Sequence, residues 1–107
     1  MHGDRSGQIV VIFLSVRTGA DDSGYAAAAE AMAALAAVQP GYRGIESTRG
    51  ADGFGVTLSF WADEASALAW RDNPDHARIR DAGRARWYSR YEVIVCAAQR
   101  SYAWTRP

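Results

Sequence analysis

The strongest constraint on the fold lies near the start of the chain, where residues 8–17 read QIVVIFLSVR. β-Branched and aromatic side chains follow one another almost without interruption, and the run is short, so the pattern predicts a central β-strand rather than a helix. Its side chains alternate between two faces, with Val10, Ile12, Leu14 and Val16 on one and Val11, Phe13, Ser15 and Arg17 on the other. Because both faces carry apolar side chains, other parts of the protein must shield both faces from water.

The remaining elements follow in a regular order. In chain order, the sequence predicts a helix over 25–38, strands over 42–49 and 54–61, helical segments over 64–73 and 74–86, and a strand over 88–98. Pro40 stops the first helix, because proline cannot continue a helix and disfavours it at the preceding residue. Asp63 and Asn73 are good N-caps for the two later helical segments.

The order β-α-β-β-α-β is that of the split βαβ, ferredoxin-like arrangement, an α+β fold with an antiparallel sheet and helices on one face. A chain of 107 residues forms a single domain, with residues 1–7 and 101–107 expected as flexible or dimer-contacting tails. The helices leave an apolar row uncovered on the other face, which includes Ile12, Leu14 and Leu58. A second copy that lays its sheet on this face would cover it, so we expect a C2 homodimer.

Composition and charge exclude several classes of protein. Lys+Arg and Asp+Glu both number 12, so the formal net charge is zero, which argues against a general nucleic-acid-binding protein. The sequence has no apolar signal-peptide core and no stretch long enough to span a bilayer, and we expect a cytoplasmic protein. The lone Cys96 excludes an intramolecular disulfide and a cysteine-based zinc site, and its apolar neighbours predict a buried, inert thiol.

The four tryptophans supply large apolar surfaces with polar N–H tips. Packing in the core or at a dimer interface is one interpretation, and a flat, aromatic-walled pocket is another. Trp61 shares a strand face with Thr57 and Ser59, and polar side chains that face helices need partners, water or a ligand. We therefore expect a cavity between sheet and helices, bordered by Trp61 and by Trp70 on the following helix.

His76, Arg80 and Arg84 recur every four residues and share one helix face. This face is either a solvated surface, partly paired with nearby aspartates, or a site for an anionic or phenolate-like ligand. His76 is either a cap or surface residue or a general base, because an imidazole titrates near neutral pH.

Several of these residues together resemble the antibiotic biosynthesis monooxygenase domain. The segments are PGYRGIES over residues 40–47, VTLSFW over 56–61 and DEA over 63–65, followed by Trp70 and His76. The resemblance spans about residues 8–100. It implies the dimeric α+β barrel fold, in which two ferredoxin-like protomers pack sheet to sheet. The fold hosts several chemistries, so the site residues must decide between them.

The family resemblance implies two known activities. Cofactor-independent members oxidise phenolic polyketides or quinols by letting the substrate's own carbanion activate oxygen, and they use an Asn and a Trp of the third strand. Trp61 matches that Trp, whereas Thr57 stands at the Asn position. Haem-degrading members use a first-strand Asn, a second-helix Trp and a His; Trp70 matches the Trp, whereas Ser15 and Arg80 stand at the other two positions.

The leading hypothesis is a cofactor-independent monooxygenase that takes a planar phenolic, quinol or polyketide substrate and oxygen, with no metal. His76 is assigned as the general base and Arg80 as the electrostatic stabiliser of phenolate or enolate charge. Trp61 stands at the family's catalytic position, and Trp61 and Trp70 form the walls around the ring. Thr57, Ser59 and Ser15 are assigned as substrate-binding groups. The alternatives are a haem-binding or haem-degrading protein and a non-catalytic small-molecule-binding dimer.

Overall fold

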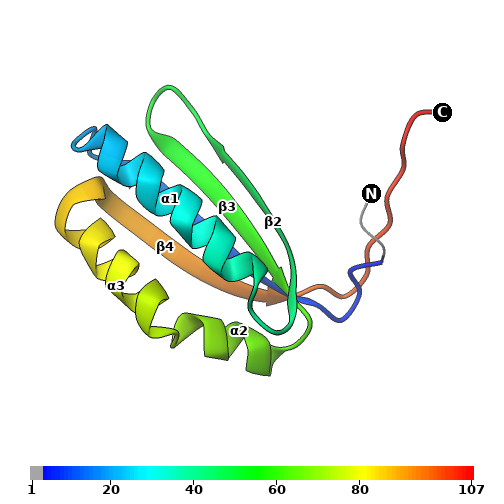
Figure 1. Ribbon diagram of the computed structural model, residues 1–107. Coiled ribbons are helices and arrows are strands. Elements are labelled where there is room, and N and C mark those ends of the chain that lie inside the picture. Colours follow the sequence, from blue (N-terminus) through cyan, green and yellow to red (C-terminus); the bar gives the residue numbers. More distant parts are fainter. Residues whose placement is uncertain (1–3) are drawn as a thin grey trace.

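The computed structural model describes residues 4–107 and has the predicted ferredoxin-like α+β fold (Figure 1). The elements in chain order are β1 (Ile9–Arg17), α1 (Asp22–Ala37), β2 (Tyr42–Arg49), β3 (Phe54–Trp61), α2 (Glu64–Arg71), α3 (Pro74–Ala82), the π-helical turn η1 (Gly83–Trp87) and β4 (Tyr88–Ala97). The helices lie on one side of the sheet, and the described segments before β1 and after β4 leave the sheet at the same end (Figure 1).

The sheet has the strand order β2-β3-β1-β4, and every neighbouring pair is antiparallel. The register sets Trp61 opposite Ile9 and Tyr42, and Ser59 opposite Val11. Residues that face each other across an antiparallel pair point to the same side. The predicted alternation of β3 is therefore confirmed, because Trp61 belongs to the side on which the helices pack.

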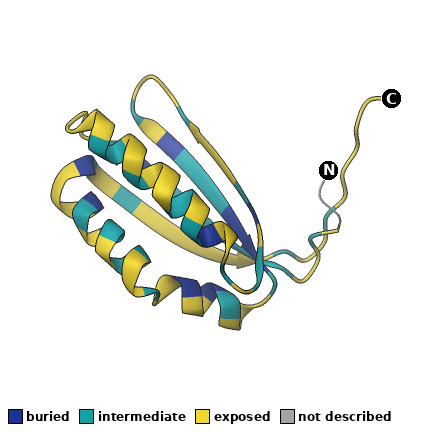
Figure 2. Ribbon diagram, viewed as in Figure 1, coloured by how far each residue is buried: buried dark blue, intermediate teal, exposed yellow. Residues whose placement is uncertain are grey.

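The core is small and lies between the sheet and the ends of α1 and α2. Its buried members are Ala36, Trp61, Ala67 and Trp70, with Trp61 wholly inaccessible to solvent. Figure 2 shows these buried positions gathered at the end of the sheet where α1 ends and α2 begins. The larger part of the sheet is only partly covered by the helices.

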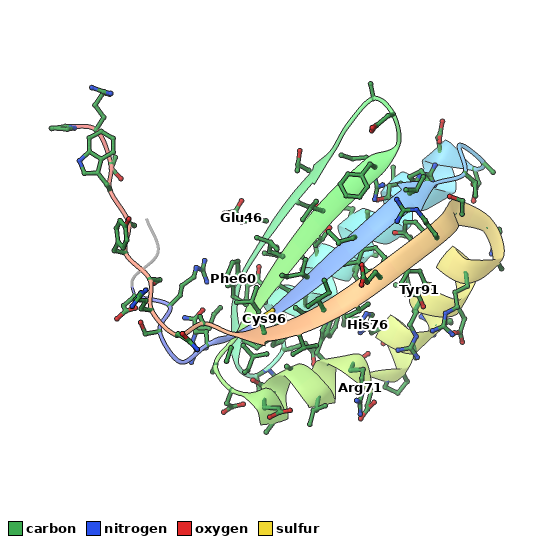
Figure 3. The ribbon with its side chains drawn as sticks, turned by 180° about the vertical axis from the view of Figure 1, so that it is seen from behind. Glu46, Phe60, Arg71, His76, Tyr91 and Cys96 are labelled. Carbon is green, nitrogen blue, oxygen red and sulfur yellow. The ribbon has the colours of Figure 1, made fainter. Side chains whose placement is uncertain are left out.

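The outward face of the sheet carries the apolar row predicted from the sequence. Val10, Ile12 and Leu14 of β1 alternate with the helix-facing residues, and no described element packs over the centre of this row. One end is covered by Arg5, whose guanidinium lies 3.5 Å from the ring centroid of Phe60. Figure 3 views the sheet from this side, with Phe60 and Cys96 near one end.

One expectation about local structure is corrected, and one is refined. Cys96 was expected to be buried, but its thiol is exposed, because β4 is an edge strand and Cys96 lies on the outward face. The last helical segment runs to about Arg86 as predicted, and at Gly83 it changes from an α-helix into a π-helical turn. A Cβ at Gly83 would lie 2.8 Å from the Tyr88 ring, so this position favours glycine.

The helix starts follow the predicted caps. Asp63 forms a capping box with Ser66, and the side chain of Asn73 accepts from the N–H groups of Asp75 and His76. The first helix begins at Asp22, three residues before the expected start, because Asp21 adopts a left-handed conformation and accepts from the Gly24 N–H. The strands β2 and β3 have the predicted bounds.

Substitution of Gly41 should destabilise the protein more than substitution of Gly19. Both glycines have φ +82°, but a Cβ at Gly41 would overlap the Ser66 side chain, whereas one at Gly19 meets nothing within 4 Å. We expect Gly19→Ala to cost about 1 kcal/mol of unfolding free energy from backbone strain, and Gly41→Ala about 1–3 kcal/mol more from the overlap. Urea denaturation of both variants measures the difference, and equal losses would contradict this packing.

Candidate active site

Four rings from β2, β3, α2 and α3 contact one another in a continuous series, which we call the aromatic stack: Tyr42, Trp61, Trp70 and His76. Tyr42 meets Trp61 edge to face, and the other two pairs are stacked. The ring centroids are 5.9 Å apart for Tyr42 and Trp61, 5.7 Å for Trp61 and Trp70, and 4.3 Å for Trp70 and His76. The last pair is nearly parallel, with an interplanar angle of 13°. The series places His76 against the core rather than on a free surface.

His76 is held in one orientation from two sides. It lies in the first turn of α3, where its backbone N–H donates to Asn73 Oδ1, and its Nδ1 lies 2.8 Å from the backbone oxygen of Trp70. A carbonyl oxygen can only accept, so Nδ1 carries the hydrogen in the neutral ring. The lone pair of the neutral imidazole is then on Nε2, which forms no hydrogen bond with any described residue.

The surroundings of His76 favour the neutral imidazole. Burial lowers the pKa of His76 below its ordinary value of 6.5, the Trp70 carbonyl partly opposes that change, and the positive charge of Arg80 lowers the pKa further. His76 is thus unprotonated at neutral pH. An imidazole in that state can accept a proton from an acidic substrate.

Arg80 lies one helical turn beyond His76 on α3 and is partly buried. Its Nη1 makes a long, 3.5 Å hydrogen bond to the Arg71 carbonyl, and its Nε is buried without a hydrogen-bond partner among residues 4–107. A buried guanidinium N–H without an acceptor is costly. The sequence therefore placed His76 and Arg80 on one face correctly, and the structure adds an unused donor there.

The three site residues predicted on β3 already have partners within the protein. The indole N–H of Trp61 donates to Ser59 Oγ at 3.0 Å, and Thr57 Oγ1 lies 2.7 Å from Ser47 Oγ. Trp61 is fully buried and contacts Trp70, which separates it from His76 in the stack. Trp61 therefore lies behind Trp70, and it does not line the groove beside α2 described below.

Ser15 lies at the far end of the sheet from His76, in a polar cluster that sequence reasoning missed. Its hydroxyl is fully buried and accepts from Arg49 Nη2 at 2.8 Å, and the same nitrogen donates to Tyr25 Oη at 3.1 Å. Tyr25 in turn bonds to Tyr88, whose burial is the main reason that the pKa of this phenol is raised. Strand alternation places Arg49 on the helix-facing side, which is the one sequence signal that could have found it.

The predicted basic face of His76, Arg80 and Arg84 is partly occupied by contacts within the protein. Arg84 Nε donates to the hydroxyl of Tyr91 on β4 at 2.5 Å, and its other end lies 4.0 Å from Asp81. Figure 3 shows His76 in the region between β4 and the helices α2 and α3, with Tyr91 farther along β4. His76 and Arg80 thus belong to α3 and Arg84 to the following turn η1, and the hydrogen bond to Tyr91 joins Arg84 to β4.

A groove of about 310 Å³ lies beside α2, away from Thr57 and Ser59. It is lined by Gln39, Pro40, Gly41, Asp63, Ala65, Ser66, Ala69 and Trp70. It shares Trp70 with the aromatic stack and contains none of the polar side chains assigned to the chemistry. The cavity expected between the sheet and the helices therefore stays a prediction.

Within residues 4–107, no three His, Cys, Asp or Glu side chains are grouped so that they could hold a metal ion. A single imidazole, His76, has a nitrogen available as a ligand. No helix in the described part of the chain is long and apolar enough to cross a membrane.

Residues 7–82 match the family described as "Antibiotic biosynthesis monooxygenase". The chain belongs to this family. It is also 43% identical over 90 residues to the uncharacterized protein YqjZ of Bacillus subtilis (strain 168), an alignment that covers 84% of this chain and 78% of that protein. The resemblance inferred from the sequence is therefore confirmed.

Solved structures show the same fold. A mutant form of SnoaB, a cofactor-independent oxygenase from Streptomyces nogalater, superimposes with a TM-score of 0.78 at 19% identity, covering 90% of this chain and 97% of that one. Rv0793 from Mycobacterium tuberculosis gives a TM-score of 0.74 at 19% identity, covering 84% and 93%. At these identities the likeness establishes the fold alone.

The pKa of His76 should lie below 6.5 in the folded protein and rise towards that value in an Arg80→Gln variant. Burial is the larger cause of the lowered pKa, so the variant removes only the Arg80 contribution. NMR titration of the imidazole protons measures both values. Because the pKa of His76 is higher in the unfolded state, that state binds the imidazole proton more readily. The unfolding free energy should therefore fall as the pH drops from 6.5 through the folded pKa. A wild-type pKa at or above 6.5 would contradict the described burial.

Proposed function

We propose that this protein is a cofactor-independent monooxygenase that oxidises a planar phenolic, quinol or polyketide-type small molecule. The observation that carries the proposal is the combination on α3 of an unprotonated His76 nitrogen and a buried Arg80 donor without an acceptor. The first can take a proton from an acidic phenol or activated carbon, and the second can stabilise the resulting anion. Membership of the family supports the reaction class.

The chemistry needs no external reductant. His76 Nε2 accepts a proton from a methylene group that a neighbouring phenol and carbonyl make acidic, and the carbanion reduces oxygen and forms a carbon–oxygen bond. The hydroperoxide then loses water and leaves a carbonyl. One oxygen atom enters the product, the other leaves as water, and the substrate supplies all the electrons. Arg80 stabilises the anion before oxygen reacts.

The surface next to α3 suits a flat apolar ring. Val93 and Val95 of β4 pair with Phe13 and Val11, so their side chains lie on the helix-facing side of the sheet. They are nonetheless 50% and 58% exposed, because no helix covers this part of β4. An aromatic substrate over these valines would bury apolar surface and bring its acidic group towards the basic side of α3.

We also propose that the protein acts as a homodimer whose two sheets pack face to face. The outward row of Ile12, Leu14 and Leu58 has no cover among the described residues, and Ile94 on the neighbouring strand is 37% exposed. Contiguous apolar surface of this kind is typical of an interface between subunits. Association would also bury the exposed thiol side of β4, where Cys96 lies.

Loss of the base should affect turnover more than binding. We expect His76→Ala to lower turnover by about 10²–10⁴-fold, the range for removal of a general base, with little change in the dissociation constant of the substrate. Oxygen uptake with a panel of anthrones and quinols gives the rate, and fluorescence quenching gives the dissociation constant. The control is Arg78→Gln on the same helix, whose guanidinium pairs with Asp75 and whose side chain is 74% exposed.

The alternatives give different results in the same samples. A Soret band on addition of haem, lost in His76→Ala, would replace the proposal with a haem protein. Tight binding of phenolic compounds without oxygen uptake would leave a non-catalytic binding protein. Turnover that is equal in wild type and His76→Ala would remove His76 from the mechanism.

The proposed interface predicts that Leu58→Asp shifts the protein to a monomer. A carboxylate at the centre of the outward face would be buried unpaired in the dimer, at a cost of about 3–5 kcal/mol. The matched control is Leu68→Asp on α2, where the leucine is 40% exposed on a different surface. Sedimentation velocity at micromolar concentration should show a monomer for the first variant and a dimer for the second. A monomeric wild type would contradict the interface.

A further inference from the structure

The aromatic stack extends beyond the part that the proposed function uses. His76 and Trp70 are at one end, and the series continues through Trp61 to Tyr42 on β2, with no centroid spacing above 5.9 Å. Indole and phenol are among the protein side chains that lose a single electron most readily. Rings in contact allow an electron to move from one to the next in short steps.

The surroundings of each ring fit a path of this kind. Trp61 is fully buried, and its N–H meets a neutral hydroxyl, Ser59 Oγ, which has little tendency to take the proton. A Trp61 ring that loses an electron would therefore keep its proton and recover an electron quickly. Tyr42 is partly exposed near the start of β2, the edge strand opposite β4, so its phenol can release a proton to water.

A second aromatic cluster in the molecule gives a useful contrast. Around Tyr25 and Tyr88, two guanidinium groups lie close to the rings, with Arg17 at 4.0 Å and Arg49 at 5.5 Å from the Tyr25 centroid. Nearby positive charge disfavours removal of an electron from a ring. Over the rings of Tyr42, Trp61 and Trp70, the described residues place no guanidinium group, so the aromatic stack is the easier of the two clusters to oxidise.

We propose that the aromatic stack is an electron path from Tyr42 to the candidate active site, which reduces stray radicals formed there. A peroxyl radical that escapes the normal reaction would take an electron from Trp70 and a proton from solvent, and become a hydroperoxide. Trp70 regains an electron from Trp61, and Trp61 from Tyr42, which gives its phenolic proton to water. The oxidising equivalent thus leaves the site as a tyrosyl radical at the opposite edge of the sheet.

The source of the radical rests on the proposed function, but conduction through the rings does not, and it can be tested without substrate. Arg71 adjoins Trp70 in α2 and its side chain is 62% exposed, so Arg71→Cys offers a position for a rhenium(I) diimine photo-oxidant. The background carries Cys96→Ser, because Cys96 is the only other cysteine. It also carries Tyr102→Phe and Trp104→Phe, because these rings are 97% and 70% exposed and would react by collision.

A light flash should produce a tryptophan radical first and then a tyrosyl radical. Transient absorption and electron paramagnetic resonance detect both radicals. In Tyr42→Phe the tyrosyl signal should be lost and the tryptophan radical should live longer. Tyr42 is only partly buried, so this variant should fold, which circular dichroism checks. Trp61→Phe should abolish the tyrosyl signal by breaking the path in the middle.

Two results would overturn the path. One is that Trp70 does not quench the excited state of the rhenium label. The other is that the tryptophan radical decays without formation of a tyrosyl radical at Tyr42. Absence of oxygen uptake in the earlier assays would instead remove the proposed monooxygenase and leave the flash result unchanged. The two failures are therefore distinguishable.

Discussion

The contact between Trp61 and Trp70 is the interaction on which the rest of this structure depends. Trp61 is the largest side chain wholly withdrawn from solvent among the described residues, and Trp70 stacks on it with ring centroids 5.7 Å apart. Burial of two indole rings supplies several kcal/mol, an order-of-magnitude figure that is large against the stability of a small domain. This contact fixes α2 on β3, while most of the sheet keeps only loose cover from the helices. The core is thus concentrated at one end of the molecule.

The same contact determines the chemical state of His76. Once Trp70 is fixed, its ring and its backbone oxygen together hold the imidazole, which lies in the first turn of α3 under the Asn73 cap. Burial against Trp70 and the charge of Arg80 keep the ring neutral, and the hydrogen bond at Nδ1 directs the lone pair to Nε2. Core packing and the proposed base catalysis therefore share one set of contacts.

Local sequence patterns predicted much of the fold, because strand alternation, turn residues and helix caps act over short distances. They placed the strands β2 and β3 and the caps Asp63 and Asn73 correctly. They could not predict the change from α-helix to π-helical turn at Gly83, or the hydrogen bond from Arg49 to Ser15, which joins residues 34 positions apart. For the site, helical spacing placed His76 and Arg80 on one face. Alternation gave the face of Trp61 but not what covers it, and so it left open whether Trp61 packs in the core or borders a pocket.

The protonation pattern of His76 is the most direct test of this account. Long-range ¹⁵N–¹H correlation spectra of the folded protein at neutral pH distinguish a nitrogen that carries hydrogen from one that carries a lone pair. The account predicts a neutral ring with hydrogen on Nδ1, held by the Trp70 carbonyl, and a bare Nε2. A charged imidazolium at neutral pH, or a neutral ring with its hydrogen on Nε2, would contradict it, because the nitrogen facing a substrate could then accept no proton.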